Sequence, residues 1–220
     1  LGKDQPLSVY ISQLEKDTLY YYSVAHRVSG QSGFSAGAES TFRTQRAAGS
    51  TFSFGVQGDS HPERLNKMFN PALYTQNMNN VISSHPDFYF TMGDDFSIEK
   101  LIENNELSQS SVNSVYAFQR AFLGMVGLSS PIFMVNVNHE QAAQYLLDGT
   151  PDNFAVLAGT AKNEYYPLPA TDSFYSGDNQ QVPYIGYLRD YYAWTWGDAL
   201  FVVIDPYWHS SVAVDNMAGG

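Results

Sequence analysis

The sequence lacks cysteine, has few basic residues and contains no long apolar run. Without cysteine among its 220 residues, the chain has neither disulfides nor thiolate metal sites. Lysine and arginine number 11 against 22 aspartates and glutamates, which gives a net charge of −11. A surface with this charge repels polyanions, and no apolar run approaches the roughly 18 residues that span a bilayer. We therefore expect no nucleic-acid partner and no membrane span.

The first 45 residues have the composition of a small β-module. The stretches LSVYISQL, TLYYYSVAHRV and AESTFRT are rich in β-branched and aromatic residues and are separated by Gly/Ser-rich turns. Leu14, Thr18, Tyr20 and Val24 fall at even steps, so all four can face one side of a strand and its approach. This spacing resembles the tyrosine corner of an immunoglobulin-like sandwich, and in particular the last three strands of a fibronectin type III domain.

A complete sandwich of that kind needs about 100 residues. We therefore predict that residues 1–45 form a partial, all-β immunoglobulin- or fibronectin-like module. A small β-module that only tethers or packs against its neighbour is the structural alternative.

Residues 46–220 show the alternation of strands and helices that is typical of an α/β sheet. Helices are expected near residues 62–84, with an interruption around Pro71, and over the stretch SSVNSVYAFQRAFLGMVG. Between residues 141 and 198 lies a Pro-, Tyr- and Gly-rich passage, a kind of segment that is often a lid or a binding loop. Parallel-type strands are predicted at 51–57, 87–92, 131–136 and 199–205.

Three of these predicted strands end in polar clusters of similar chemistry, namely GDSH (58–61), GDD (93–95) and NHE (138–140). Side chains at the carboxyl ends of neighbouring strands can converge on one point. Oxygen and imidazole donors suit Zn, Mn or Fe, and an aspartate can bridge two ions about 3.5–4 Å apart. The three clusters in this order therefore favour a metal site.

Each cluster alone also has an ordinary structural explanation. A Gly-Asp pair after a strand is commonly a turn or a helix cap. The NHE cluster could begin a helix, with Glu140 as a carboxylate of its first turn rather than a metal ligand.

The clusters GDSH, GDD and NHE resemble the first three blocks of the calcineurin-like metallophosphoesterases, a superfamily that includes the purple acid phosphatases. The later stretch RDYYAWTWGDALFVVIDPYW is also similar to members of that superfamily, so the resemblance covers about residues 51–210. It implies an α/β metallophosphoesterase-type sheet layered with helices, of which residues 46–220 would be the incomplete amino-terminal part.

The resemblance also implies a reaction and a set of site residues. Asp59 and His61 would bind a first metal ion, Asp94 would bridge both ions and Asn138 would bind the second. The catalytic residue would be His139, beside the scissile phosphate. The implied activity is hydrolysis of a small phosphorylated substrate by two divalent or trivalent ions (Fe, Mn or Zn), in a secreted or periplasmic protein.

The sequence departs from the family pattern at three places. Ser97 stands where the family has Asp or Tyr, and Val137 stands where it has Gly, which would strain the turn if that position needs a positive φ. Downstream of His139 the only histidine is His209, and the family's G-H-x-H block is absent. Two alternatives thus stay open: an inactive phosphatase-like scaffold that acts as a binding module, and another two-metal hydrolase such as a nucleotidase or phosphodiesterase.

Overall fold

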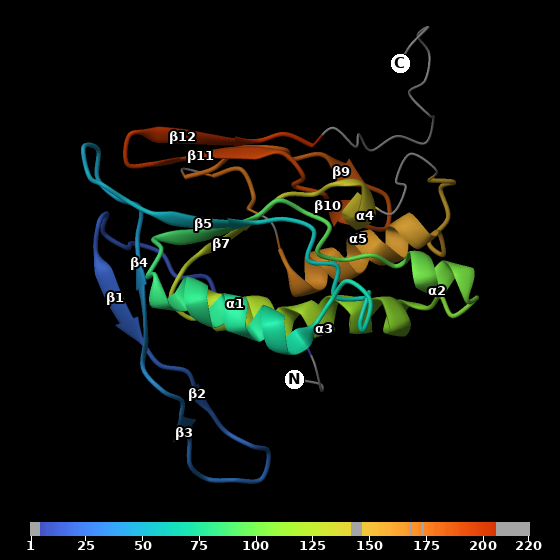
Figure 1. Ribbon diagram of the computed structural model, residues 1–220, viewed down its shortest axis with the longest axis horizontal. Coiled ribbons are helices and arrows are strands. Elements are labelled where there is room, and N and C mark those ends of the chain that lie inside the picture. Colours follow the sequence, from blue (N-terminus) through green and yellow to red (C-terminus); the bar gives the residue numbers. More distant parts are fainter. Residues whose placement is uncertain (1–4, 142–146, 168, 173, 206–220) are drawn as a thin grey trace, which may run out of the picture.

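The computed structural model describes residues 5–141, 147–167, 169–172 and 174–205, and its centre is a parallel sheet (Figure 1). The sheet contains β5 (Phe54–Gln57), β6 (Phe88–Thr91) and β7 (Ile132–Met134), in the order β5-β6-β7. All three strands were predicted from the sequence, and their parallel pairing is confirmed. Their carboxyl ends lie at the same edge of the sheet, where the three polar clusters follow.

Helices cover one face of this sheet. These are α1 (Pro71–Ser83), α3 (Gln109–Gly127) and α5 (Phe154–Tyr165). Pro71 begins α1 instead of interrupting a longer helix, because it occupies the first turn, where no backbone N–H is needed. The preceding Asn70 caps the helix, since its Oδ1 accepts hydrogen bonds from the Ala72 and Leu73 amides at 3.0 and 3.2 Å.

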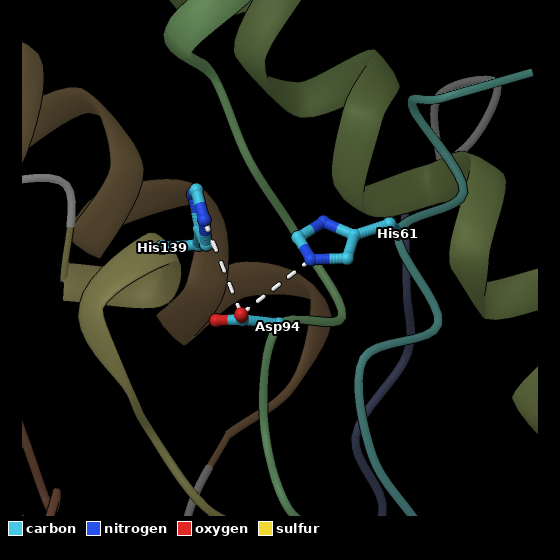
Figure 2. Close-up of side chains that lie close together, drawn as sticks. All are labelled: His61, Asp94 and His139. Atoms are coloured by element: carbon cyan, nitrogen blue, oxygen red, sulfur yellow. Dashed lines mark ion pairs between the residues drawn. The ribbon is translucent and has the colours of Figure 1, made fainter. Parts of the chain in front are cut away.

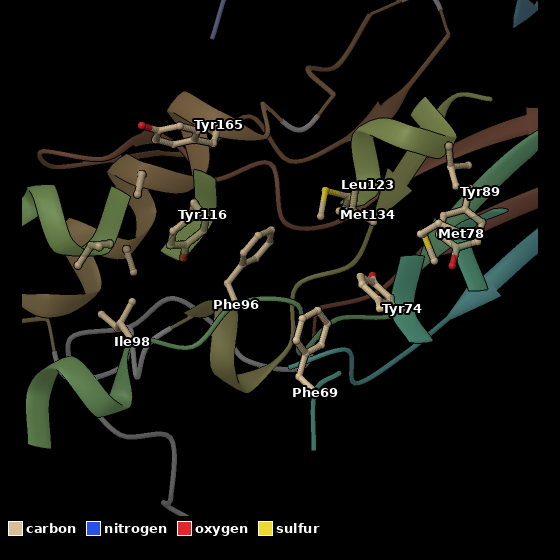
Figure 3. Packing of buried hydrophobic residues seen from close by; sticks show 14 residues of the cluster. Phe69, Tyr74, Met78, Tyr89, Phe96, Ile98, Tyr116, Leu123, Met134 and Tyr165 are labelled. Carbon is tan, nitrogen blue, oxygen red and sulfur yellow. The ribbon is translucent and has the colours of Figure 1, made fainter. Parts of the chain in front are cut away.

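A hydrophobic cluster fills the space between the helices and the sheet (Figure 3). Tyr74 and Met78 of α1, Tyr89 of β6, and Tyr116 and Leu123 of α3 are all buried in it. The helical spacing of apolar residues in α1 and α3 therefore serves one continuous core.

The opposite face is covered by a second, antiparallel sheet of β8 (Ser176–Gly177), β11 (Tyr192–Trp196) and β12 (Ala199–Val203), in the order β12-β11-β8. The prediction of residues 199–205 as a further parallel strand was wrong. Only Gly197 and Asp198 separate β11 from β12, and a two-residue connection can join only antiparallel strands. Gly197 allows this hairpin turn with a φ of 59°.

The two sheets pack face to face through aromatic side chains. Phe133 of β7 stacks on Trp194 of β11 with ring centroids 4.0 Å apart, and Phe88 of β6 contacts Phe201 of β12 at 5.2 Å. The chain thus forms a helix layer, a parallel sheet and an antiparallel sheet, in that order (Figure 1).

The passage from residue 141 to residue 198 is not the irregular segment that its composition suggested. It contains α5, which Asn153 caps: the Asn153 side chain accepts a hydrogen bond from the Ala155 amide at 2.9 Å. Small residues let α5 lie close to α3. Two short strands follow in the same passage, β9 (Gln181–Val182) and β10 (Gly186–Tyr187).

The amino-terminal residues form two small antiparallel pairs. β1 (Leu19–Tyr22) pairs with β4 (Ser40–Arg43), and β2 (Ala25–His26) pairs with β3 (Ser35–Ala36). The strand predicted at 7–14 does not form: these residues have no partner strand within the described chain and carry exposed apolar side chains. The Tyr20 hydroxyl accepts a hydrogen bond from the Glu15 amide at 2.8 Å, the contact expected of a tyrosine corner. The fibronectin-like identity and the boundary at residue 45 stay predictions.

The amino-terminal segment attaches to the rest of the chain through polar contacts of Arg46 and Tyr22. Arg46 Nε lies 2.5 Å from the buried Asp87 Oδ1, and the Tyr22 hydroxyl donates a hydrogen bond to the Leu128 carbonyl at 2.8 Å. Within the described residues, no helix is long and apolar enough to cross a membrane.

Candidate metal centre

The loops after β5, β6 and β7 bring two histidines and one aspartate together (Figure 2). His61 follows β5, Asp94 follows β6, and His139 lies in α4 (Asn138–Gln141), which follows β7. Each of the three offers one ligand atom, and these atoms all lie within 4.8 Å of one another. The predicted convergence of the three strand ends thus holds for these residues.

Both imidazole rings direct Nε2 at the same carboxylate. His61 Nε2 lies 3.5 Å and His139 Nε2 lies 3.9 Å from Asp94 Oδ2. The two rings are nearly perpendicular, at 84°, with their centroids 5.1 Å apart. An ion placed between these atoms would meet two imidazole nitrogens and a carboxylate oxygen.

A second carboxylate lies near the Nδ1 atom of each imidazole. His61 Nδ1 lies 2.9 Å from Glu63 Oε1, and His139 Nδ1 lies 3.1 Å from Glu99 Oε1 at the start of α2 (Glu99–Glu103). A carboxylate at Nδ1 holds the proton there and leaves the Nε2 lone pair for a metal. The Glu99 contact is the weaker of the two, because it is not aligned as a hydrogen bond and its side chain is 61% exposed.

The two remaining predicted ligands are more exposed. Asp59 Oδ1 lies 4.0 Å from His61 Nε2, at the edge of the group, and its side chain is 79% exposed. Asn138 is exposed at the first residue of α4. Their predicted roles stay predictions, whereas His139, predicted to face the phosphate, is one of the three residues that could hold an ion, with its Nε2 3.9 Å from Asp94 Oδ2.

The ligand loops have an unusual backbone conformation. Asp59, His61 and Asp94 have φ values of 52°, 43° and 54°, and each non-glycine residue in this region costs about 1–2 kcal/mol. Backbone hydrogen bonds hold the first two loops together, from the Asp59 amide to the Gly93 carbonyl and from the His61 amide to the Asp94 carbonyl, both at 3.1 Å. Strain of this kind is commonly found where side chains must be aimed for function.

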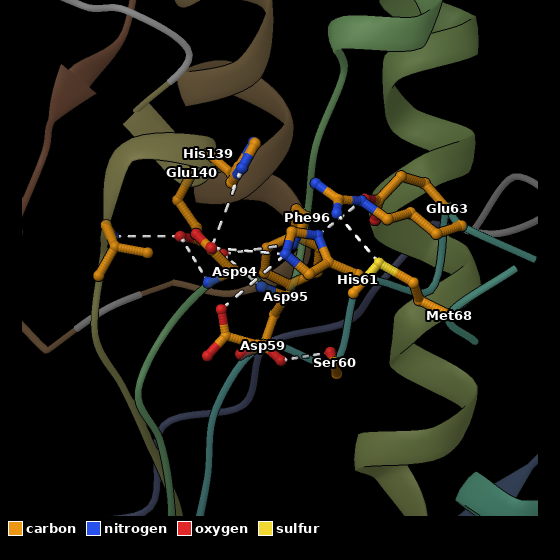
Figure 4. A network of polar contacts seen from close by, with 12 residues as sticks. Asp59, Ser60, His61, Glu63, Met68, Asp94, Asp95, Phe96, His139 and Glu140 are labelled. Carbon is orange, nitrogen blue, oxygen red and sulfur yellow. Dashed lines mark hydrogen bonds and ion pairs between the residues drawn. The ribbon is translucent and has the colours of Figure 1, made fainter. Parts of the chain in front are cut away.

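Glu140 holds the second and third loops together (Figure 4). Its carboxylate accepts hydrogen bonds from the amides of Asp94, Asp95 and Phe96 at 3.1, 2.6 and 3.2 Å, and from the Val137 amide at 3.1 Å. Burial raises the pKa of Glu140 to about 7 and the nearby Asp95 adds to this rise, while Lys162 and the backbone donors oppose it. Glu140 is therefore a buried clamp on the Asp94 loop rather than only a first-turn carboxylate.

Asp95 joins the first and second loops in a similar way. Its side chain is buried, and Oδ1 accepts hydrogen bonds from Ser60 Oγ at 2.7 Å, Gln57 Nε2 at 3.1 Å and Gln119 Nε2 at 3.3 Å. Burial raises the pKa of Asp95, and these donors counteract the rise. Two buried carboxylates, Asp95 and Glu140, thus fix the three ligand loops relative to one another.

Val137 does not strain the third loop, because it is not among the described residues with positive φ. The left-handed conformation lies instead at Gly93, with a φ of 90°, and a Cβ added there would come within 2.5 Å of Val137 Cγ2. The valine side chain thus covers the glycine that precedes Asp94. A glycine is required in the second loop, and the third loop accepts a β-branched residue.

These residues fit a metal ion by their chemistry. Asp94 Oδ1 is buried and has no hydrogen-bond partner among the described residues, so this oxygen lacks the donor that a buried acceptor needs. Burial raises the pKa of Asp94, while His139 and His61 counteract the rise. A bound cation would also lower this pKa. The donor set is typical of Zn, Mn or Fe sites.

The fold is similar to that of two solved structures. Purple acid phosphatase PPD1 from yellow lupin (Lupinus luteus) seeds superposes with a TM-score of 0.54 at 16% sequence identity, over 87% of this chain and 31% of that chain. PhoD superposes with a TM-score of 0.50 at 18% identity, over 90% of this chain and 38% of that chain. The chain therefore spans well under half the length of either protein.

At these identities the likeness shows the fold alone. The chain has mixed helices and sheets in an arrangement similar to these phosphoesterase folds, as the resemblance implied. No protein-family model and no curated protein sequence matches the chain.

Sequence reasoning missed the residues that orient and support the ligands. Glu63 follows His61 by two positions, but nothing in the local pattern marks it as the partner of Nδ1. Glu99 and Gln119 are brought to the site only by tertiary packing. His209 lies outside the described residues.

Proposed function

We propose that this chain forms the metal-binding part of an enzyme that hydrolyses phosphate esters with a two-metal centre. The observation that carries the proposal is the convergence of two imidazole Nε2 atoms on one carboxylate, at 3.5 and 3.9 Å, with a further carboxylate behind each ring. The phosphoesterase-like fold supports the same conclusion.

In this proposal Asp59 and His61 would hold the first ion, Asp94 would be shared by both ions and Asn138 would contribute to the second. Bound ions would supply a nucleophile at neutral pH and neutralise charge on the phosphoryl oxygens. His139 faces the same space as Asp94, with its Nε2 3.9 Å from that carboxylate. From there it can bind an ion or hold a proton for the leaving oxygen.

The substrate in this proposal is a small phosphorylated molecule, and the net charge of −11 argues against a nucleic acid. The placement is extracytoplasmic, secreted or periplasmic, as the resemblance of the sequence implies. The ligands that complete the coordination of the two ions would come from residues outside the three clusters.

The first test is calorimetric titration of the purified chain with Mn²⁺ or Zn²⁺. Asp94→Ala removes the carboxylate that both imidazoles face, so its affinity should fall by at least about 100-fold. Asp152→Ala, at an exposed position in a loop, is the matched control and should bind as the wild type does. Equal affinity in the wild type and Asp94→Ala would contradict the proposed site.

Hydrolysis of p-nitrophenyl phosphate and of bis(p-nitrophenyl) phosphate by the metal-loaded chain separates monoester from diester chemistry. Turnover of either ester, lost in Asp94→Ala, supports the enzyme. Metal binding without turnover of either ester would favour the inactive binding scaffold instead.

A further inference from the structure

An arginine lies beside the candidate metal centre and has no role in the proposed reaction. Arg64 follows His61 by three positions, and its amide donates a hydrogen bond to the His61 carbonyl at 2.9 Å. Its Nε lies 3.4 Å from Glu63 Oε1, the same oxygen that lies 2.9 Å from His61 Nδ1. The guanidinium group is therefore held next to the first ligand loop by a carboxylate that it shares with His61.

The outer nitrogens of this guanidinium group are available to a ligand. Nη1 of Arg64 contacts Met68 Sδ at 3.3 Å, and a thioether sulfur is a weak acceptor. Among the described residues, no oxygen accepts a hydrogen bond from Nη1 or Nη2. The side chain is 33% exposed, so solvent reaches it. The planar fork of an arginine matches a carboxylate or a phosphate group.

The imidazole of His61 separates Arg64 from the position of an ion. His61 Nε2 faces Asp94 Oδ2 at 3.5 Å, whereas Nδ1 faces Glu63 and, through it, Arg64. A phosphoryl group bound to the ion would lie on the Nε2 side of the ring. The guanidinium group is therefore placed for a different part of the substrate from the one that reacts.

A hollow beside the site offers room for that other part. Its volume is about 490 Å³, and its lining includes Asp59 of the first ligand loop, Met68, and Leu73 of α1. Met68 is the residue that Arg64 Nη1 contacts, and Asp59 is the exposed ligand predicted for the first ion. A molecule that extends from this ion along the hollow would pass close to the guanidinium group.

We propose that Arg64 is a specificity-determining residue that binds a second anionic group of the substrate, a carboxylate or a further phosphate, beside the phosphate ester that the metal centre hydrolyses. The proposal rests on the proposed function, since it concerns the same site. It narrows the substrate class to small phosphorylated molecules with another negative group. Without Arg64, a chain with a net charge of −11 would repel that second group.

The experiment compares two phosphonates, whose C–P bond a phosphate esterase does not hydrolyse. Phenylphosphonate offers the metal centre one anionic group, and (4-carboxyphenyl)phosphonate adds a carboxylate to the same ring. Calorimetric titration of the full, Mn²⁺-saturated chain gives the affinity for each. The wild type should bind the carboxylated compound about fivefold more tightly, as expected of a partly exposed ion pair. Arg64→Gln should abolish or reverse this preference.

Equal affinities of the wild type for the two compounds, or an unchanged preference in Arg64→Gln, would overturn the proposal. Lys67→Gln removes the same charge at an exposed position three residues further along the loop, and it should keep the preference. A titration with 1,4-phenylenediphosphonate distinguishes the two kinds of second group, because the larger gain over phenylphosphonate identifies the group that Arg64 binds better.

The ratio of the two affinities separates recognition from a purely structural role. If Arg64 only supported Glu63 and His61, its removal would weaken the binding of Mn²⁺ and of both phosphonates and would leave their ratio unchanged. Arg64→Lys keeps the test decisive if Arg64→Gln folds poorly. It retains the charge beside Glu63 but lacks the planar fork, so the preference should fall to about twofold; a full fivefold preference would contradict the proposed role.

The wild-type titrations also distinguish failure of this proposal from failure of the proposed function. If the wild type binds no Mn²⁺, the proposed function and the role of Arg64 fall together. If it binds Mn²⁺ and phenylphosphonate but shows no preference for the second anionic group, the metal centre stands and only the role of Arg64 is wrong.

Discussion

Two places in this molecule hold a Gly-Asp pair at a strand end beside further buried carboxylates, and they differ in what surrounds them. At the end of β6, Gly93 and Asp94 lie next to the buried Asp95 and Glu140. At the end of β8, Gly177 and Asp178 lie beside Asp190, and these two aspartates are 4% and 6% exposed. Local sequence and burial alone do not distinguish the two places.

The difference lies in the imidazoles and in the donors. The Asp94 loop donates three amide hydrogen bonds to Glu140 and faces the Nε2 atoms of two histidines. The Asp178–Asp190 pair lies beside a pocket of about 210 Å³ that no described histidine lines. Acidic residues at a strand end therefore do not define a metal site; oriented imidazoles that share the carboxylate do.

The largest effect on this comparison is expected from Gly93→Ala. The new Cβ would lie 2.5 Å from Val137 Cγ2 in a residue with a φ of 90°, so the free energy of unfolding should fall by about 3 kcal/mol. Chemical denaturation in urea measures this change.

Two further variants separate the contact with Val137 from the cost of the positive φ as causes of this loss of stability. Gly30 has a φ of 87°, and a Cβ added there would meet nothing within 4 Å, so Gly30→Ala should cost only about 1 kcal/mol. Val137→Ala in the Gly93→Ala background should restore part of the stability. Equal losses at Gly93 and Gly30 would show that the contact with Val137 is unimportant.

Asp190→Asn should stabilise the protein at high pH. Burial, together with the neighbouring Asp178, raises the pKa of Asp190 to about 6. A raised carboxyl pKa means that the stability contributed by Asp190 is full below about pH 4 and is lost as the pH rises through 6. Asparagine cannot ionise, so the variant should be more stable by about 2 kcal/mol at pH 8 and nearly unchanged at pH 4.

Thermal denaturation at both pH values measures this difference, with the exposed Asp152→Asn as the control. The same variant should bind Mn²⁺ as the wild type does. A stabilisation that does not depend on pH would contradict the assignment of the effect to ionisation of Asp190.

The smallest effect is expected from Glu63→Gln. The amide oxygen of glutamine can still accept a hydrogen bond from His61 Nδ1, but it does so without charge and holds the ring less firmly. Metal affinity should fall by about tenfold, measured by calorimetry. Glu103→Gln, at an exposed position of α2, should change nothing, and an unchanged affinity in Glu63→Gln would remove Glu63 from the site.

The sequence was sufficient to predict the parallel strands and the convergence of their carboxyl ends. Apolar runs that stop at Gly58 and Gly93 locate β5 and β6, and the chemistry of the clusters indicates a metal. The placement of β12 was missed because the two-residue turn before it decides its direction, whereas its composition is that of any buried strand.

The support of the site could not be predicted from local pattern. Glu140 accepts amide hydrogen bonds from residues about 45 positions away, and Gln119 donates to Asp95 only because α3 packs into the same core. Both depend on tertiary packing, which leaves no periodic signal in the sequence. The same limit explains why the exposure of Asn138 was not foreseen.

The most direct test of the metal centre is the anomalous difference density of a crystal of this chain soaked in Mn²⁺ or Zn²⁺. The account predicts a peak within bonding distance of His61 Nε2, Asp94 and His139 Nε2, and none between Asp178 and Asp190. A peak at the Asp178–Asp190 pair, or no peak at the three strand ends, would contradict it.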